Sequence, residues 1–194
     1  MKHVVAVVVL IITLGIVLDR LPQQPVTRMS YPFRLLQMQL REPDTVLLMP
    51  VQGVSVQRVA NTWHALRPGG RQHLGQDIFA RRGTPVVSAT DGIVVRVGTN
   101  NLGGNVVSVM GNGGRLYYYA HLEGYAEGIS TGDAVSAGDV LGYVGNTGNA
   151  KTTPPHLHFG VYTATGAVNP LPLLVDRSEP APGNAESQRR TARS

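Results

Sequence analysis

The chain has 194 residues, no cysteine, 23 glycines, 13 prolines and a formal net charge of +5 at pH 7. This length suits one well-buried domain with short appendages, and the lack of cysteine excludes disulfide bonds and thiolate metal ligands. The basic residues are spread along the chain without a dense cluster, so the composition does not indicate nucleic-acid binding.

The first residues differ in kind from the rest. Residues 4–18 are apolar apart from Thr13 and Gly15, with Lys2 before them and a charged pair, Asp19 and Arg20, after them. Such a segment is shorter than the roughly 20 residues that span a bilayer as a helix and is typical of a signal-peptide core, but no cleavage site of small residues follows it. We therefore predict that residues 1–20 are an uncleaved signal anchor with Lys2 on the cytoplasmic side. Cleavage would instead give a secreted protein.

Residues 21–45 are predicted to be a stalk between the anchor and the main domain. Within them, residues 31–40 carry a weak amphipathic pattern that indicates a short connecting helix, or one that lies at the membrane surface. Residues 46–175 form the main domain. From residue 176 to 194 the chain is rich in Arg, Ser, Glu, Ala and Pro with few large apolar residues, which is typical of a disordered tail.

Short runs of β-branched and aromatic residues recur through the main domain between turns that contain Gly, Asn or Asp. The runs are residues 85–89, 93–97, 105–110, 115–120, 140–144 and 157–162. No stretch between them has a convincing helical period. The pattern predicts an all-β, antiparallel domain, built as a two-sheet sandwich or a partly closed barrel with a groove across one face.

A first cluster of possible metal ligands lies just before these strands. In an extended segment, residues at i, i+2 and i+4 point to the same face, so His73 and Asp77 would flank Gly75 on one side. A glycine between two ligands leaves room for a cation of modest size. Alone, this pattern usually marks a turn.

A second cluster lies near the end of the domain. The alternation of an extended strand turns the imidazoles of His156 and His158 to one face and Leu157 to the other. His121 follows an aromatic strand in the middle of the domain. Two histidines and one carboxylate would give zinc three protein ligands and leave a fourth position open for water, which is the pattern of a catalytic site.

The order of these and neighbouring motifs resembles the LytM/lysostaphin-type zinc metalloendopeptidases, which cleave the peptide part of bacterial peptidoglycan. The resemblance runs from about residue 62 to residue 170. It rests on His-x-Gly-x-Asp at 73–77, Gly-Thr-Pro-Val at 83–86, Asp-Gly at 91–92, Tyr-Ala-His-Leu at 119–122, Gly-Asn-Thr-Gly at 145–148 and Pro-His-Leu-His-Phe at 155–159.

This resemblance implies that His73, Asp77 and His158 hold one zinc ion and that His121 and His156 are the catalytic pair. One of the two would remove a proton from water as general base while the other stabilises the oxyanion, in an order that the sequence leaves open. The implied partners are peptidoglycan peptides and, through the anchor, the inner membrane. By analogy the protein is expected in the cell envelope, anchored in the cytoplasmic membrane with its catalytic domain in the periplasm. In one departure from the family pattern, Gly160 follows Phe159 where relatives often have an acidic residue.

Two other functions fit parts of the same sequence. A non-catalytic LytM-like regulator of other cell-wall hydrolases fits the same fold, but this chain retains all the ligands and both catalytic histidines; zinc content and cleavage of peptidoglycan separate the two. A biotinyl or lipoyl carrier module is suggested by the Gly-turn segment at 135–141. The attachment lysine is missing from it, because Lys151 lies in a Thr- and Pro-rich loop.

Overall fold

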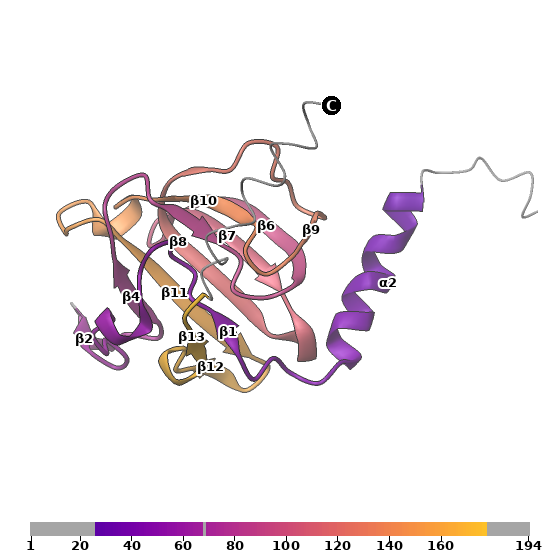
Figure 1. The fold of residues 1–194 in the computed structure, drawn as a ribbon, viewed down its shortest axis with the longest axis horizontal. Coiled ribbons are helices and arrows are strands. Elements are labelled where there is room, and N and C mark those ends of the chain that lie inside the picture. The colour runs from indigo at the N-terminus through magenta and orange to yellow at the C-terminus, as the bar shows by residue number, and fades with distance from the viewer. Residues whose placement is uncertain (1–25, 68, 178–194) are drawn as a thin grey trace, which may run out of the picture. The chain divides into compact units, whose positions relative to one another are not determined.

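The computed structural model describes residues 26–67 and 69–177 (Figure 1). The predicted signal anchor at 1–20 and the tail from residue 178 lie outside these described residues. Among the helices that the structure describes, none combines the length and the apolar character needed to cross a membrane. Asp176 still contacts the domain, because its carboxylate accepts hydrogen bonds from Ser55 Oγ at 2.8 Å and from Val56 N at 2.6 Å.

A single α-helix, α2 (Val26–Leu40), precedes the strands in the described part of the chain and includes the 31–40 stretch with the amphipathic pattern. The chain divides into two compact units between Arg34 and Leu35, inside this helix, and all the described strands belong to the second unit.

The described strands form one large sheet and two small ones. The large sheet has nine strands with the central order β12-β11-β8-β7-β6-β9, and all its pairs are antiparallel. Its strands are β4 (Gln76–Phe79), β5 (Pro85–Val87), β6 (Gly92–Asn100), β7 (Gly104–Met110), β8 (Leu116–Tyr125), β9 (Ala134–Val135), β10 (Val140–Val144), β11 (His156–Thr163) and β12 (Gly166–Val168). The small sheets are β1 (Leu47–Leu48) with β13 (Leu174–Val175), which are parallel, and the antiparallel pair β2 (Leu66–Arg67) with β3 (Arg71–Gln72).

The predicted β-rich, antiparallel character is confirmed for the large sheet, and this sheet does not close into a barrel. Within the described residues β12 and β9 end the path of the sheet and do not pair with each other. The physical reason lies in β8, whose first part pairs with β7 and β11 while its last part pairs with β10, which in turn pairs with β5. The sheet therefore branches instead of closing.

Alternation along the central strands separates the core from the site. On β11, Leu157 and Phe159 are fully buried in the core, while His156 and His158, which alternate with them, face the other side. On β8, Tyr117 and Tyr119 are fully buried, and their rings pack against Phe159 with centroids 6.4 and 5.2 Å away. The opposite faces of β8 and β11 are thus left for function.

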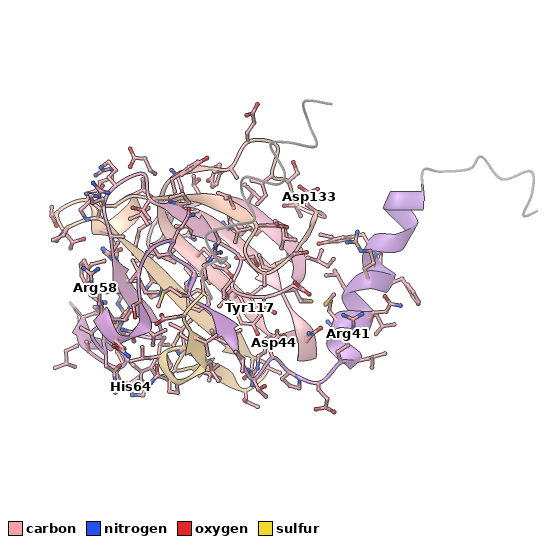
Figure 2. The ribbon with its side chains drawn as sticks, viewed as in Figure 1. Arg41, Asp44, Arg58, His64, Tyr117 and Asp133 are labelled. Carbon is pink, nitrogen blue, oxygen red and sulfur yellow. The ribbon has the colours of Figure 1, made fainter. Side chains whose placement is uncertain are left out.

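The segment before β1 is anchored to this core by Asp44. The carboxylate accepts hydrogen bonds from Tyr117 Oη at 2.7 Å and from the backbone and side-chain nitrogens of Asn112 at 3.2 and 2.9 Å. Figure 2 shows Asp44 beside Tyr117 at the end of the sheet. These bonds satisfy a phenol that is otherwise fully buried.

Candidate metal centre and catalytic cleft

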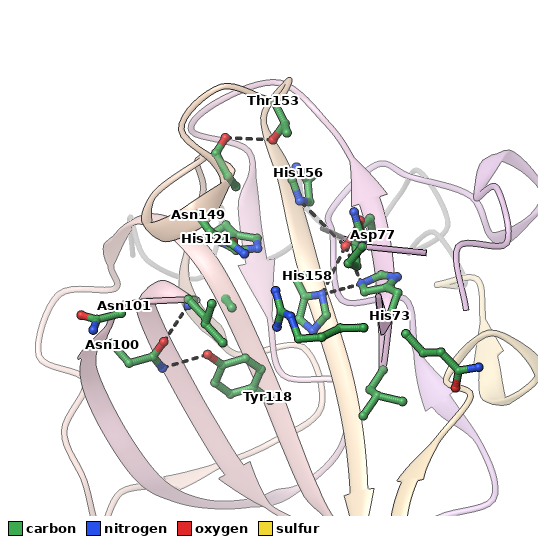
Figure 3. A pocket seen from close by; sticks show the side chains of 18 of the residues that line it. His73, Asp77, Asn100, Asn101, Tyr118, His121, Asn149, Thr153, His156 and His158 are labelled. Carbon is green, nitrogen blue, oxygen red and sulfur yellow. Dashed lines mark hydrogen bonds and ion pairs between the residues drawn. The ribbon is translucent and has the colours of Figure 1, made fainter. Parts of the chain in front are cut away.

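Three side chains from two separate segments of the chain converge between β4 and β11 (Figure 3). Asp77 on β4 lies directly opposite His158 on β11, and His73 precedes β4 by a few residues. His73 Nε2 is 2.8 Å from His158 Nδ1 and 3.1 Å from Asp77 Oδ1, and His158 Nδ1 is 3.2 Å from the same oxygen. The structure thus brings together all three residues that the sequence put forward as metal ligands.

The geometry of these three atoms fits a small divalent cation. Zinc bonds of about 2.0–2.1 Å in a tetrahedral site would separate two ligand atoms by about 3.3 Å, and the observed triangle is only a few tenths of an ångström tighter. His73 Nδ1 lies 2.7 Å from the carbonyl oxygen of Thr62, which can only accept. His73 therefore carries its proton on Nδ1 and points the lone pair of Nε2 at the other two ligand atoms, an arrangement that a proton or a cation must stabilise.

The electrostatics keep these groups in the protonation states that a metal requires. Burial by itself raises the pKa of Asp77, but the polar contacts of its carboxylate with His158, His73 and Arg67 outweigh burial and hold this pKa well below its usual range. Burial lowers the pKa of His158. The result is an ionised carboxylate beside a neutral imidazole, and metal ligation needs both.

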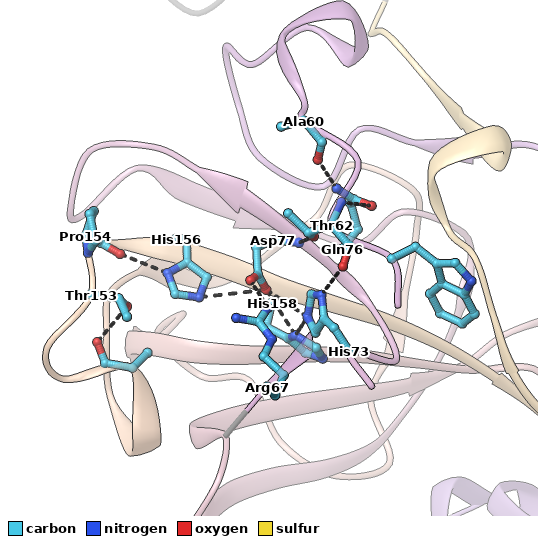
Figure 4. A network of polar contacts seen from close by, with 12 residues as sticks. Ala60, Thr62, Arg67, His73, Gln76, Asp77, Thr153, Pro154, His156 and His158 are labelled. Carbon is cyan, nitrogen blue, oxygen red and sulfur yellow. Dashed lines mark hydrogen bonds and ion pairs between the residues drawn. The ribbon is translucent and has the colours of Figure 1, made fainter. Parts of the chain in front are cut away.

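Residues before the ligands support them from the loop that leads into β2 and from β2 itself (Figure 4). The Arg67 guanidinium pairs with Asp77 Oδ2, the carboxylate oxygen that does not face the histidines. Thr62 accepts from His73 through its carbonyl and from the Asp77 backbone through its hydroxyl, at 2.9 Å. Sequence reasoning missed Arg67 and Thr62, because neither belongs to a motif and only the fold carries them to the ligands.

Gly75 has a different role from the one predicted. A Cβ built on it would lie 2.6 and 2.7 Å from Cε1 and Nε2 of His158 and 2.9 Å from the carbonyl oxygen of Phe159. The space that the missing side chain leaves is therefore occupied by a ligand imidazole, because the pairing of β4 with β11 brings the His158 ring over this position. The prediction that the cation itself fills this space is wrong.

His121 and His156 lie beside the three ligands, with ring centroids 5.0 Å apart. His121 Nδ1 is 2.9 Å from the carbonyl oxygen of Thr147, and His156 Nδ1 is 2.8 Å from that of Pro154. Because a carbonyl oxygen can only accept, both rings carry a proton on Nδ1 and, when neutral, offer the lone pair of Nε2. His156 Nε2 lies 3.8 Å from Asp77 Oδ1, at the edge of the ligand cluster.

Burial, followed by the proximity of the His156 and His158 imidazoles, lowers the pKa of His121 to about 4. Its imidazole is consequently neutral at pH 7 and able to accept a proton.

A bulge in β8 turns His121 toward the cleft. Between Asn105 and Val107 of β7, β8 runs from Leu122 to Tyr119 and so contains one extra residue. His121 lies there with φ of 63°, a left-handed conformation that costs energy in a residue other than glycine. The bulge lets two successive residues, Ala120 and His121, line the same cleft, which plain alternation would forbid.

The five residues His73, Asp77, His121, His156 and His158 line a cleft of about 1100 Å³. The rest of the cleft wall includes Arg71, Leu74 and Tyr162, and also Asn100, Leu102 and Asn149. The predicted groove across one face is present, and it is large enough for a peptide.

Comparison with known proteins identifies this arrangement. Residues 71–170, about half of the chain, match the sequence profile of Peptidase family M23. The chain belongs to this peptidase family. The M23 region contains His73, Asp77, His121, His156 and His158, whereas Thr62 and Arg67 precede it.

Individual relatives agree with this membership. The M23 chain is 42% identical over 125 residues to the L-Ala--D-Glu endopeptidase of Bacillus subtilis, covering 59% of this chain and 38% of that one. The crystallised catalytic domain of lysostaphin from Staphylococcus simulans superimposes with a TM-score of 0.54 and 32% identity, covering 60% of this chain and 92% of the domain. Csd3 of Helicobacter pylori gives a TM-score of 0.57 with 29% identity, covering 80% of this chain and 44% of the Csd3 chain. The chain spans only 22–38% of the length of the curated Bacillus and Staphylococcus relatives that it matches.

Proposed function

We propose that this chain is a zinc-dependent endopeptidase that hydrolyses stem or cross-link peptides of bacterial peptidoglycan. Membership of Peptidase family M23 supports hydrolysis of a peptide bond. Relatives named L-Ala--D-Glu endopeptidase, glycyl-glycine endopeptidase and peptidoglycan DD-endopeptidase support peptidoglycan as the substrate. The observation that carries the proposal is the convergence of three ligand atoms beside two imidazoles that present Nε2 to an open cleft.

His73 Nε2, Asp77 Oδ1 and His158 Nδ1 would hold the metal. Two imidazoles and one carboxylate favour zinc over magnesium or calcium, which prefer oxygen ligands alone. Bound there, zinc would polarise the scissile carbonyl and lower the pKa of a water molecule toward neutrality.

His121 and His156 would handle the protons. Each ring has its Nδ1 proton committed to a backbone carbonyl, so a proton can be taken up only at Nε2. One neutral ring accepts a proton from the attacking water, whose oxygen bonds to the carbonyl carbon. The imidazolium so formed then gives this one proton from Nε2 to the departing amine, as the carbon–nitrogen bond breaks and the negative oxygen re-forms the carbonyl. General acid–base catalysis of this kind typically contributes about 10²–10⁴ in rate.

Where the protein works follows from this substrate. We propose that residues 1–20 anchor the chain in the cytoplasmic membrane and that the β domain acts outside it, where peptidoglycan lies. Fusing a reporter that is active only outside the cytoplasm to the end of the chain tests this orientation, and an intact fusion whose reporter is inactive would refute it.

The function is tested with the purified full chain. We expect about one zinc per molecule by elemental analysis, and new peptide fragments by mass spectrometry after digestion of purified peptidoglycan. Removing the metal with a chelator should stop the digestion, and adding zinc should restore it. A folded protein that binds no zinc and cleaves nothing would instead support the non-catalytic regulator.

A further inference from the structure

Charge in the cleft is unevenly distributed. Among the described residues that line it, Arg67, Arg71 and Asp77 carry formal charge, and the one acidic group already serves the ligand cluster. The wall toward His121 presents neutral amide and hydroxyl groups, such as Asn100, whose amide donates to Tyr118 Oη at 2.9 Å. Positive charge is thus concentrated along the β2–β3 side of the cleft.

The two arginines face each other across the β2–β3 hairpin. Arg67 and Arg71 are direct partners in the register of this pair, and side chains opposite each other in an antiparallel pair lie on the same face of the sheet. Like charges in such positions repel each other. Asp77 neutralises Arg67, but no ion pair or hydrogen bond engages the Arg71 guanidinium within the described part of the chain. This exposed guanidinium on the cleft wall is available for an anion.

A carboxylate is the anion that suits this position in a peptide-binding cleft. The planar guanidinium binds carboxylates through two parallel hydrogen bonds. Stem peptides of peptidoglycan carry free carboxylates on D-glutamate and on diaminopimelate, whereas a glycine bridge has no charged side chain.

We infer that Arg71 is a specificity-determining residue that selects stem peptides with a free carboxylate near the scissile bond over amidated stem peptides and glycine bridges. This inference rests on the proposed function. A single charge-assisted hydrogen-bond pair at a partly exposed site corresponds to a preference of about tenfold.

The test uses the zinc-loaded full chain and three synthetic substrates. Two are cross-linked stem-peptide dimers that differ only in whether the carboxylates of glutamate and diaminopimelate are free or amidated, and the third is pentaglycine. We expect wild-type kcat/KM to be about tenfold higher for the free acid than for the amide, with the difference mainly in KM. Arg71→Gln should bring this ratio close to one, and Arg71→Lys should retain part of it.

Arg81→Gln is the matched control, because it removes the same charge from an exposed arginine outside the cleft lining. It should keep the wild-type preference. In wild type, the KM for the free acid should also rise with ionic strength, since a partly exposed ion pair is screened by salt. This second measurement needs no variant and so does not depend on the folding of Arg71→Gln.

Equal kcat/KM for the free and amidated dimers, efficient cleavage of pentaglycine, or an Arg71→Gln variant that keeps the preference would each overturn the inference and leave the proposed function intact. A zinc-loaded protein that cleaves none of the three substrates would overturn the proposed function itself.

Discussion

Replacing Gly75 with alanine introduces one methyl group against a metal ligand. The new Cβ would lie 2.6 Å from Cε1 and 2.7 Å from Nε2 of His158, whereas ordinary contact begins at 3.4 Å. The imidazole must therefore move by about 0.8 Å, or the backbone of β11 must move with it, because the carbonyl oxygen of Phe159 is also only 2.9 Å away.

A movement of this size matters more for metal binding than for folding. Metal–ligand distances tolerate about 0.2 Å, so a displaced His158 ring no longer completes the triangle of ligand atoms. We expect Gly75→Ala to weaken zinc binding by about 10- to 100-fold, which is the range seen when residues around a metal site are changed. Overpacking at this position should cost about 1–3 kcal/mol of unfolding free energy.

The assay is competition for zinc against a chelating dye, together with thermal unfolding in the presence and absence of zinc. Gly98→Ala is the matched control, because a Cβ there meets nothing within 4 Å and the residue lies in β6. It should bind zinc as wild type does. If Gly75→Ala bound zinc with wild-type affinity, the position of His158 over Gly75 or its role as a ligand would be refuted.

Three further outcomes are expected. His158→Ala should lose zinc and activity together, whereas His156→Ala should keep zinc and lose about 10²–10⁴ in turnover. Full metal content in His158→Ala, or full activity in His156→Ala, would contradict the assigned roles. Arg67→Ala should lower zinc affinity by about 10- to 100-fold and Arg67→Lys should restore part of it, as chelator competition would measure; unchanged affinity in Arg67→Ala would rule this support out. Burial raises the pKa of Tyr117 and Tyr119. The stability that they contribute is therefore fully present below about pH 10 and is lost above it, because these tyrosines then ionise in the unfolded chain first. The free energy of unfolding should fall by about 1.4 kcal/mol per pH unit for each tyrosine. Urea unfolding between pH 9 and 11 measures this loss, which should be roughly halved in Tyr117→Phe and would be absent if these phenols were solvated.

The left-handed conformation of His121 and the exposed guanidinium of Arg71 both have a local energetic cost. Each lies on the cleft, one turned inward by a bulge and the other facing a second arginine across a hairpin. Strained or repulsive arrangements tend to persist where function requires them. This tendency supports their proposed roles in proton transfer and in substrate selection.

Motif order along the chain was sufficient to recognise the family, and the alternation of apolar residues was sufficient to predict an antiparallel β domain. Both signals are local: a strand exposes every second residue to the core, and the His-x-Gly-x-Asp and His-x-His segments place their polar groups on one face whatever the rest of the fold does. Sequence alone therefore put forward His73, Asp77 and His158 as ligands and His121 and His156 as their neighbours.

Tertiary structure decided everything that depends on pairing between distant segments. The register of β4 against β11 placed the His158 ring over Gly75, and the branching of β8 kept the sheet from closing into a barrel. The loop before β2 and the β2–β3 hairpin brought Thr62 and Arg67 to the ligands and Arg71 to the cleft wall. Such contacts depend on how strands pair and how loops fold back on them, so no local periodicity or motif records them.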